Sequence, residues 1–445
     1  MDAAPQVPEF GVPSTRQVDI SFDNRGDRLI GLGLINGLFK VLTLGLYSFW
    51  AKTEVRRKLW SFTRFNGEPL EYNGTGKELF LGFLIVFGAV ILPVMLGAVA
   101  VSMGFPGQRQ AISLYNAFIY LLFFLLVGNA MYRAQRYRLS RTQWRGIRGA
   151  LVGSPGRYGW TYFWTLAAPI AGIAAIAGFI AWLVGPKVGG VIMVVGLLAA
   201  LWILPWRANK LQAMMTSEMR FGGSPLSYTG TSGPLYKRYM FAWFGTALVL
   251  VAAVAVSALY VLQSDIYTQI MLQQFKPSLA DGVAMAGIWL TAIILIGVIT
   301  AWYRANQMNH FAGHTHFDGA TFRGEATGKS LMWLVLSNWL LSVFALMAGA
   351  LLAVLLVSMT IEVPAVVFRA GSTPDLGGLR VLLALPPILI ITTLASTFAQ
   401  FRSARYFVSR LKLDGAVNLN AILQSDATSP KRGEGLAQVF DIDAF

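Results

Sequence analysis

Long apolar stretches alternate along the chain with short polar stretches, and this alternation predicts a membrane protein built from helices. A run of about 20 apolar residues can cross a hydrocarbon core of about 30 Å as an α-helix. We expect eight spans, at 79–103, 112–131, 160–184, 188–206, 239–262, 282–303, 330–358 and 379–401. The predicted fold is therefore a polytopic, mainly α-helical membrane bundle of about eight spans.

A further apolar segment, 29–50, is less regular than the others. It contains four glycines together with Asn36 and Lys40. Either it crosses the membrane, which places the N-terminus outside, or it dips in and returns as a re-entrant pair of short helices. Irregular backbone at membrane depth is tolerated only where protein or water covers it. We favour the re-entrant form, because residues 18–29 resemble the end of a hairpin unit.

The polar stretches between the spans share a pattern that predicts β-hairpins. In residues 50–79, a basic segment leads to two alternating runs joined by Asn66-Gly67. Asn-Gly between such runs suits a type I′ turn, in which both central residues have positive φ. Related stretches open at 132, 206, 303 and 401, with Gly second in each expected turn. The turn glycines are Gly67, Gly146, Gly223, Gly319 and Gly415.

The hairpin units all have the same orientation, which predicts parallel repeats around an axis along the membrane normal. A lone hairpin is marginally stable in water, and its open edges invite further pairing. We therefore expect the hairpins to pair edge to edge, or to stack, as one β layer beside the helices. Four parts follow: an N-terminal segment with a strand, 1–28; the short hydrophobic segment, 29–50; the repeated units, 51–425; and a tail, 426–445.

Composition supports the membrane assignment, and charge predicts the orientation. Hydrophobic residues make up 55% of the chain and charged residues 13%, whereas a soluble domain carries about 25% charged residues. Lys and Arg are concentrated in the hairpin units, so the positive-inside rule places these units and the C-terminus in the cytoplasm. The net charge of +15 predicts anionic membrane lipids as partners. It does not require nucleic acid.

The sequence contains no arrangement that predicts catalysis, a bound metal or a cofactor. The eight predicted spans lack Asp and Glu, which argues against ion coupling through a buried carboxylate. The chain has no cysteine, and its three histidines, at 310, 314 and 316, have no acidic neighbour apart from Asp318. We therefore expect neither an enzyme nor a metal or cofactor site.

A few polar residues remain as candidate contacts for lipid or another anionic ligand. Arg-Ala-Asn triplets recur at the ends of spans, where a guanidinium can bind phosphate or offset the helix dipole. Asn36 and Lys40 could bind a head group, or they could respectively hydrogen-bond between helices and extend to the membrane interface. The full set is Lys40, Asn36, Arg133, Arg207, Asn209, Arg304, Asn306 and Arg402.

Residues 36–47, NGLFKVLTLGLY, together with the basic stretch 50–57, resemble the signature of the YjgN family of bacterial inner-membrane proteins. Residues 67–74 and the tail around 433–441 are similar to that family as well. The resemblance implies the inner membrane of a Gram-negative bacterium. It implies no chemistry, and therefore no catalytic residue is carried over.

We expect a non-enzymatic, multi-pass inner-membrane protein that serves as an envelope or lipid-associated scaffold. This expectation rests on the basic residues of the hairpin units. The alternative is a transporter or channel for a small or anionic solute, not driven through a buried carboxylate. It rests on the ring that parallel repeats can form.

Overall fold

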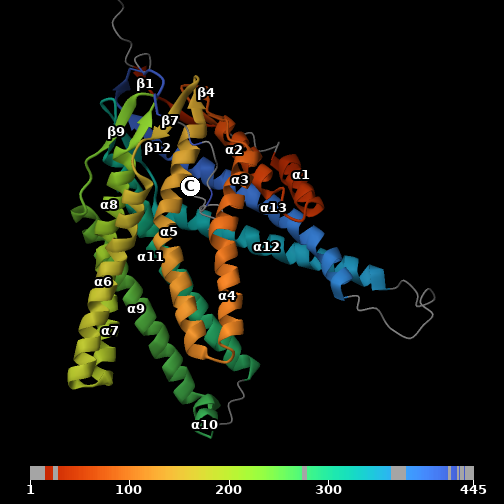
Figure 1. Cartoon of the computed structure of the whole chain (residues 1–445), viewed down its shortest axis with the longest axis vertical. Helices are drawn as coiled ribbons and strands as arrows, with labels where there is room; N and C mark the ends of the chain where they lie inside the picture. Colours follow the sequence, from red (N-terminus) through yellow and green to blue (C-terminus); the bar gives the residue numbers. More distant parts are fainter. Residues whose placement is uncertain are drawn as a thin grey trace, which may run out of the picture.

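The computed structural model describes residues 16–23, 29–272, 278–361, 377–418 and 422–427, with Pro430 and Gly435. Much of the expected N-terminal segment, 1–28, and most of the expected tail, 426–445, lie outside these residues. Helices dominate the described chain, and the strands gather at one end of it (Figure 1).

The spans are helical because apolar runs at membrane depth can satisfy their backbone hydrogen bonds only internally. The helices are α1 (Leu29–Leu42), α2 (Ser48–Phe62), α3 (Gly76–Val86), α4 (Leu92–Gly104), α5 (Arg109–Arg141), α6 (Pro155–Val184), α7 (Pro186–Ala200), α8 (Leu204–Ser217), α9 (Gly233–Gln263), α10 (Asp265–Met271), α11 (Leu279–Gly313), α12 (Gly328–Ile361) and α13 (Gly377–Ser409). A π-helical turn, Phe87–Ile91, continues α3 into α4, and a 3₁₀ turn, Leu201–Ile203, continues α7 into α8. Among the described residues, eight helical stretches are long and apolar enough to cross a membrane, which confirms the predicted fold class.

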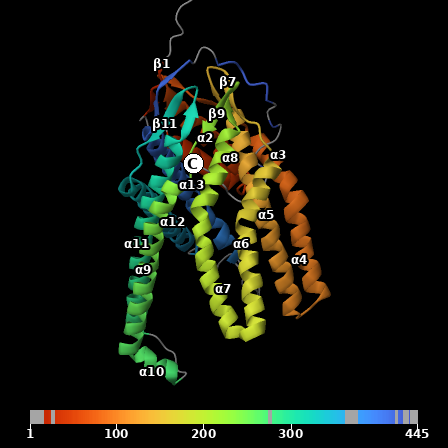
Figure 2. The same cartoon turned by 90° about the vertical axis from the view of Figure 1, so that its left-hand side faces the viewer.

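The helices contact one another in chain order and return to their start. α5 packs on α6, α6 on α7, α9 on α11, α11 on α12 and α12 on α13, and α13 then packs on α1. Glycine makes this last contact close, because a Cβ added at Gly37 would lie 2.8 Å from the Cα of Ile390. Helices α5, α6, α9 and α11 extend from the strand end of the molecule, with α4 and α7 beside them further from the strands, whereas α12 and α13 slant away (Figures 1 and 2).

The N-terminal hydrophobic segment forms a helical hairpin. α1 has 14 residues, or about 21 Å at 1.5 Å per residue, which is short for a hydrocarbon core of about 30 Å. The chain turns at Leu44 and Gly45, whose φ angles are 51° and 90°, and α2 leads back to the strands. The strand before α1 pairs with the strand after α2. Both ends of this helical hairpin therefore lie on the strand side of the molecule.

The re-entrant interpretation agrees with this geometry, but its boundary was wrong. The dip was expected to end at Trp50, whereas the returning helix begins at Ser48 and continues to Phe62. Residues that the sequence assigned to a separate basic segment are therefore the returning arm itself. Its buried positions, among them Val55 and Leu59, recur at helical spacing and hold α2 against its neighbours.

The strands come from the alternating runs between the helices. They are β1 (Arg16–Gln17), β2 (Ile20–Phe22), β3 (Thr63–Phe65), β4 (Glu68–Pro69), β5 (Glu71–Tyr72), β6 (Thr142–Trp144), β7 (Ile147–Leu151), β8 (Met219–Phe221), β9 (Ser224–Tyr228), β10 (Thr315–Phe317), β11 (Ala320–Gly324), β12 (Leu411–Asp414) and β13 (Ala416–Val417). Antiparallel pairing runs through β5-β6-β7-β8-β9-β10-β11-β12, through β2-β3-β4 and through β1-β13. Neighbouring hairpins thus pair edge to edge.

These three sheets join into one closed ring, because the chain is continuous between them. Only Leu70 separates β4 from β5, only Gly415 separates β12 from β13, and Val18 and Asp19 separate β1 from β2. Since β1 pairs with β13 while β2 pairs with β3, the first strand segment lies between the last segment and the first hairpin. The thirteen described strands therefore form ten segments of an antiparallel ring. Closure removes free edges from the described strands.

The fifth expected hairpin, at Asp414-Gly415, was wrong. β12 pairs with β11 and β13 pairs with β1, but β12 and β13 do not pair with each other. At Gly415 φ is 122°, and an added Cβ would lie 2.8 Å from the Cα of Ala320. The chain bends here without reversing, because the strand after the bend must reach β1 to close the ring.

The turn at Gly222-Gly223 also differs from the prediction. In the turns at Gly67, Gly146 and Gly319 these glycines have φ of 80°, 76° and 84°, and the residue before each also has positive φ, as type I′ requires. In the remaining turn the positive φ, 57°, belongs to Gly222, and Gly223 lies outside that region. A positive φ at the first central residue alone is the type II′ arrangement. The steric need for glycine therefore lies at Gly222.

Alanine should be tolerated at Gly223 and not at Gly222. Gly222→Ala incurs the left-handed penalty of about 1–2 kcal/mol, and its Cβ would overlap the carbonyl oxygen of Leu423. Gly223→Ala has no such penalty, and its nearest neighbouring atom is 4.0 Å away. Thermal unfolding of the purified protein in detergent should show a clear loss for the first variant and a change within about 0.5 kcal/mol for the second. Equal losses would contradict the type II′ assignment.

Candidate functional site

One apolar position recurs just before each turn or bend of the ring, and the residues there meet inside it. Phe65, Trp144, Phe221 and Phe317 follow one another around the ring, with successive ring centroids 6.4, 6.3 and 6.2 Å apart. Leu413 takes the fifth place and belongs to the same buried cluster as Phe317. We call these five residues the apolar belt. Their tilted and edge-on contacts are the arrangements that aromatic rings prefer.

The apolar belt forms part of the wall of a cavity of about 280 Å³ inside the ring. Strand alternation explains the character of this wall. On β8, for example, Met219, Arg220 and Phe221 all border the cavity, but the Arg220 side chain is exposed, whereas those of Met219 and Phe221 are half-buried. The hydroxyl of Thr142, which also lines the cavity, is already engaged with the Arg138 carbonyl oxygen at 2.9 Å. The interior of the ring is therefore apolar.

A segment beyond the last strand, residues 422–427, lies across the turns of the ring, and we call it the strap. The Gly223 N–H donates to the carbonyl oxygen of Leu423 at 2.9 Å. The Gln424 side-chain amide donates to the carbonyl oxygen of Gly146 at 2.7 Å. Ile422 is buried in the cluster that contains part of the apolar belt. The strap thus covers the end of the ring where the turns lie.

Arg148, on β7, provides most of the remaining contacts of the strap. Its guanidinium donates to the carbonyl oxygens of Ser425 and Ala427, at 3.2 and 2.7 Å. Its backbone N–H donates to Oε1 of Gln424 at 3.1 Å. Hydrogen bonds from a charged donor are stronger than those from a neutral one. Arg148 is therefore the main side chain that holds the strap to the ring.

Three junctions between helix and ring share one contact, in which a side chain of the approaching helix binds the carbonyl oxygen just beyond the next hairpin. Arg57 donates to Gly74 at 3.3 Å, Asn209 to Gly230 at 3.0 Å and Asn309 to Ala326 at 2.7 Å. A tryptophan precedes each of these side chains by seven residues, at Trp50, Trp202 and Trp302. The contact ties the end of each incoming helix to the start of the outgoing helix.

The tryptophans at these junctions do not coincide with the expected starts of the related stretches at 206 and 303. A Cβ added at Gly328 would lie 2.7 Å from the Cα of Trp302, and Trp50 covers Gly76 in the same way. Trp202 stacks on Tyr236 at the corresponding junction. The local sequences Trp206-Arg and Tyr303-Arg resemble each other, but the packing follows Trp202 and Trp302. Arg57 and Asn309 were missed because only this register connects them with Asn209.

The first Arg-Ala-Asn triplet is engaged within the protein. Asn209 also accepts a hydrogen bond from the Tyr228 hydroxyl at 2.6 Å, and burial raises the pKa of Tyr228 to about 12. The Arg207 guanidinium lies over the Tyr162 ring, 4.1 Å from its centroid, and donates to Oγ1 of Thr165 at 3.0 Å. These contacts tie α8 to α6 and to the ring.

The other candidate residues are spread over several helices. Arg304 donates to Oε1 of Gln307 at 3.1 Å, and Asn306 donates to the Trp302 carbonyl oxygen at 2.8 Å, both within α11. Arg402 donates to the Ser337 hydroxyl, and Arg133 is exposed on α5. The structure therefore does not assemble these candidates into one guanidinium site among the described residues.

Asn36 and Lys40 lie on α1. Asn36 is fully buried, beside the close contact with α13, and neither its Oδ1 nor its Nδ2 has a hydrogen-bond partner among the described residues. A buried amide without a partner is costly. Lys40 is half-buried near the end of the helix. A ligand role for either residue stays a prediction.

Two carboxylates at the edges of the spans were not singled out by the sequence. Glu218 is buried, accepts the Tyr132 hydroxyl at 2.6 Å and pairs with Arg157. Glu78 accepts the Tyr137 hydroxyl at 2.7 Å and binds Arg141 with both oxygens. The available signal for Glu78 was its position three residues after the N-cap Thr75. Because their oxygens are already engaged, both groups serve as structural ties.

The outer face of the ring carries paired charges. Arg145 lowers the pKa of Glu68 below its ordinary value through a hydrogen bond, and Lys412 does the same to Glu325. The nearest atoms of these pairs are 2.5 and 2.8 Å apart. Ion pairs this exposed contribute little to stability. They do, however, neutralise part of the basic character of the ring.

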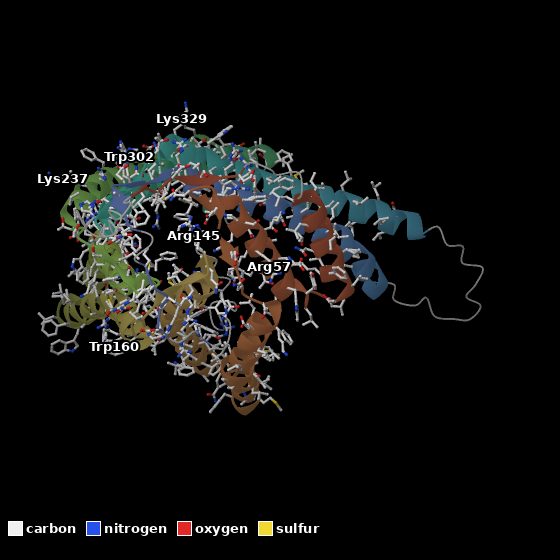
Figure 3. The ribbon with its side chains drawn as sticks, turned by 90° about the horizontal axis from the view of Figure 1, so that it is seen from above. Arg57, Arg145, Trp160, Lys237, Trp302 and Lys329 are labelled. Carbon is white, nitrogen blue, oxygen red and sulfur yellow. The ribbon has the colours of Figure 1, made fainter. Side chains whose placement is uncertain are left out.

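Three lysines have no such pairing and lie at the starts of the helices that follow the hairpins of the ring. Lys77, Lys237 and Lys329 are exposed near the N-termini of α3, α9 and α12, and none forms an ion pair within the described chain. Figure 3 shows Lys237 and Lys329 at the outer margin, with Arg57 and Arg145 further in. We call the three the rim lysines. A cation at a helix N-terminus opposes the macrodipole, so the helix itself does not account for them.

Comparison with known proteins identifies the family. The family described as "Bacterial protein of unknown function (DUF898)" matches residues 17–439, which include every described strand except the first residue of β1. The chain belongs to the DUF898 family. This family's description states no activity.

Curated relatives of the DUF898 chain are named as membrane proteins. It is 29% identical to the inner membrane protein YjgN of Salmonella typhimurium over 185 residues, which are 41% of this chain and 44% of that protein. It is 30% identical to the Escherichia coli K12 protein of the same name over 91 residues, 20% of this chain and 22% of that protein. The chain thus matches less than half the length of these relatives. No solved structure matches.

These findings confirm the resemblance to the YjgN family. They agree with the eight described helices that can cross a membrane. The DUF898 chain is therefore a multi-pass membrane protein of a family without a stated function.

Removing the Arg148 side chain should release the strap. We expect Arg148→Ala to speed proteolysis of the tail by about tenfold in detergent solution, because charge-assisted hydrogen bonds contribute about 1.5–3 kcal/mol. Mass spectrometry of the fragments measures the rate. Arg145→Ala is the matched control, since Arg145 binds Glu68 at the neighbouring turn. If the tail of both variants resisted proteolysis as well as that of the native protein, the idea that Arg148 holds the strap would be wrong.

Proposed function

We propose that this DUF898 protein is a non-enzymatic inner-membrane scaffold that associates with anionic lipids. The observation that carries the proposal is the closed strand ring with an apolar interior. Strands from both ends of the chain and from every hairpin form this ring. Each strand segment is continuous with, or next to, a helix, so the ring sets the relative positions of the helices.

The apolar interior favours a scaffold over a solute pathway through the ring. Ion and anion pathways are lined by carbonyl oxygens, charged side chains or water. The ring instead encloses the apolar belt, and the strap covers its turn end. A hydrated solute would lose its water there without new hydrogen bonds to replace it.

The rim lysines support association with lipid. They are exposed beside the membrane-spanning helices and have no acidic partner in the described chain. A basic residue near an anionic bilayer surface gains about 1 kcal/mol. A phosphate of a lipid head group would also offset the unfavourable position of each cation at a helix N-terminus.

Loss of the rim lysines should reduce lipid enrichment. We expect anionic phospholipid to be enriched in the native protein purified in mild detergent, relative to the membrane extract. In the triple variant Lys77→Gln, Lys237→Gln, Lys329→Gln that enrichment should fall by about tenfold or more, because each charge contributes about 1 kcal/mol. Quantitative lipid mass spectrometry measures it.

The matched control removes three basic residues from the ring, with Arg145→Gln, Arg323→Gln and Lys412→Gln. These residues are paired with acidic groups, so the enrichment should change little. If enrichment is missing in the native protein and proteoliposomes pass small anions, the protein is a transporter or channel and the scaffold proposal fails.

We also propose that the ring and the C-terminus face the cytoplasm, as the positive-inside rule suggests. Gln108 lies in the connection between α4 and α5, and Ser227 is exposed on β9. In a chain without native cysteine, Gln108→Cys should react with an impermeant maleimide in intact spheroplasts. Ser227→Cys should react only after permeabilisation. The reverse pattern would invert the topology.

A further inference from the structure

The ring encloses a space that its inward side chains do not fill. An eight-stranded barrel is just wide enough for side chains to fill, and the diameter grows with the number of strands. This ring has ten segments, and its inward residues leave a cavity of about 280 Å³. The void therefore follows from the number of hairpins in the ring and is not a local packing fault.

The wall of this cavity selects the class of ligand. An apolar cavity of about 150 Å³ stays free of water and takes up benzene, and this one is nearly twice that size. Aromatic and aliphatic side chains, such as Phe221, Leu226 and Val417, line it. A head group with several charged or polar atoms would find too few polar partners in this wall, so the cavity favours an apolar chain.

One polar group in the wall has no partner. Trp144 is buried in the apolar belt, and its indole Nε1–H makes no hydrogen bond among the described residues. A buried donor without an acceptor is costly. A ligand that carries a carbonyl or carboxyl oxygen at the end of an apolar chain could satisfy it.

We propose that the ring cavity binds a fatty acyl chain, whose carbonyl or carboxyl oxygen accepts a hydrogen bond from Trp144. This proposal depends on the proposed lipid association in one respect only, namely that membrane lipid is the source of the acyl chain. The strap is not the occupant, because Ile422 packs against the cluster around the belt without lining the cavity. It covers the ring from the turn end.

Photo-crosslinking of the full-length protein in nanodiscs tests this. One sample receives palmitate with a diazirine in its chain, and another receives phosphatidylglycerol with the same chain. We expect saturable crosslinks to cavity residues such as Leu226 and Phe322, competed by excess unlabelled palmitate. Labelling by palmitate alone identifies a free fatty acid as the ligand, and labelling by both identifies the acyl chain of either source.

Two variants make the test specific. Leu226→Trp fills the cavity and should lower labelling by about tenfold or more, since a close-packed interior leaves no room for the chain. The matched control is Ser227→Trp, the next residue on β9, which is exposed and should label like the native protein. Trp144→Phe keeps the apolar wall and should weaken competition by palmitate about fivefold, the worth of one ordinary hydrogen bond.

The proposal is overturned if crosslinks lie only on the outer surfaces of the spans. It is equally overturned if they lie on residues beyond the strap and on none that line the cavity. It is also overturned if Leu226→Trp labels as well as the native protein. If that variant does not fold, competition in the native protein decides. Cavity labelling without anionic lipid enrichment would support this site and reject the scaffold proposal, so the two failures are distinguishable.

Discussion

The need to pair strand edges is the constraint on which this structure depends. The strands are only two to five residues long, and an isolated hairpin of that size is marginal in water. Each hairpin gains partners by pairing with the next, but a row of hairpins still has two open ends. Pairing of β1 with β13 removes both. The small hairpins are therefore stable as one closed ring, and would be weak as separate units.

Closure also determines the packing on either side of the ring. It places the residue before each turn or bend on the inside, so that the apolar belt forms from residues far apart in the chain. It brings the first and last helices together, which is why glycine is needed where α1 meets α13. Polar side chains of the approaching helices then bind the carbonyl groups where the outgoing helices begin.

The distribution of polar groups accounts for the proposed role. Most basic and acidic side chains near the ring already bind one another or backbone carbonyls, as Glu78, Glu218 and Arg148 do. The rim lysines, by contrast, are exposed beside the spans, and the cavity inside the ring is apolar. The charged rim complements an anionic lipid head group, and the apolar interior complements an acyl chain. The proposed lipid association rests on this correspondence.

The sequence by itself determined the spans and most turns, because these depend on local properties: the length of an apolar run and the positive φ that glycine allows at Gly67 or Gly319. It also indicated that hairpins should pair, since open edges are unfavourable anywhere. It could not show that the ring closes, because that requires residues near Arg16 to meet residues near Val417. For the same reason the sequence pattern wrongly predicted a hairpin turn at Gly415, and it placed the glycine with positive φ at 223 when it is Gly222. It also aligned Trp206, and not Trp202, with Trp50. The rim lysines, the strap and the cavity likewise depend on contacts between distant segments. Only the tertiary structure decides such features, because the free energy that selects them comes from pairing and packing across the ring.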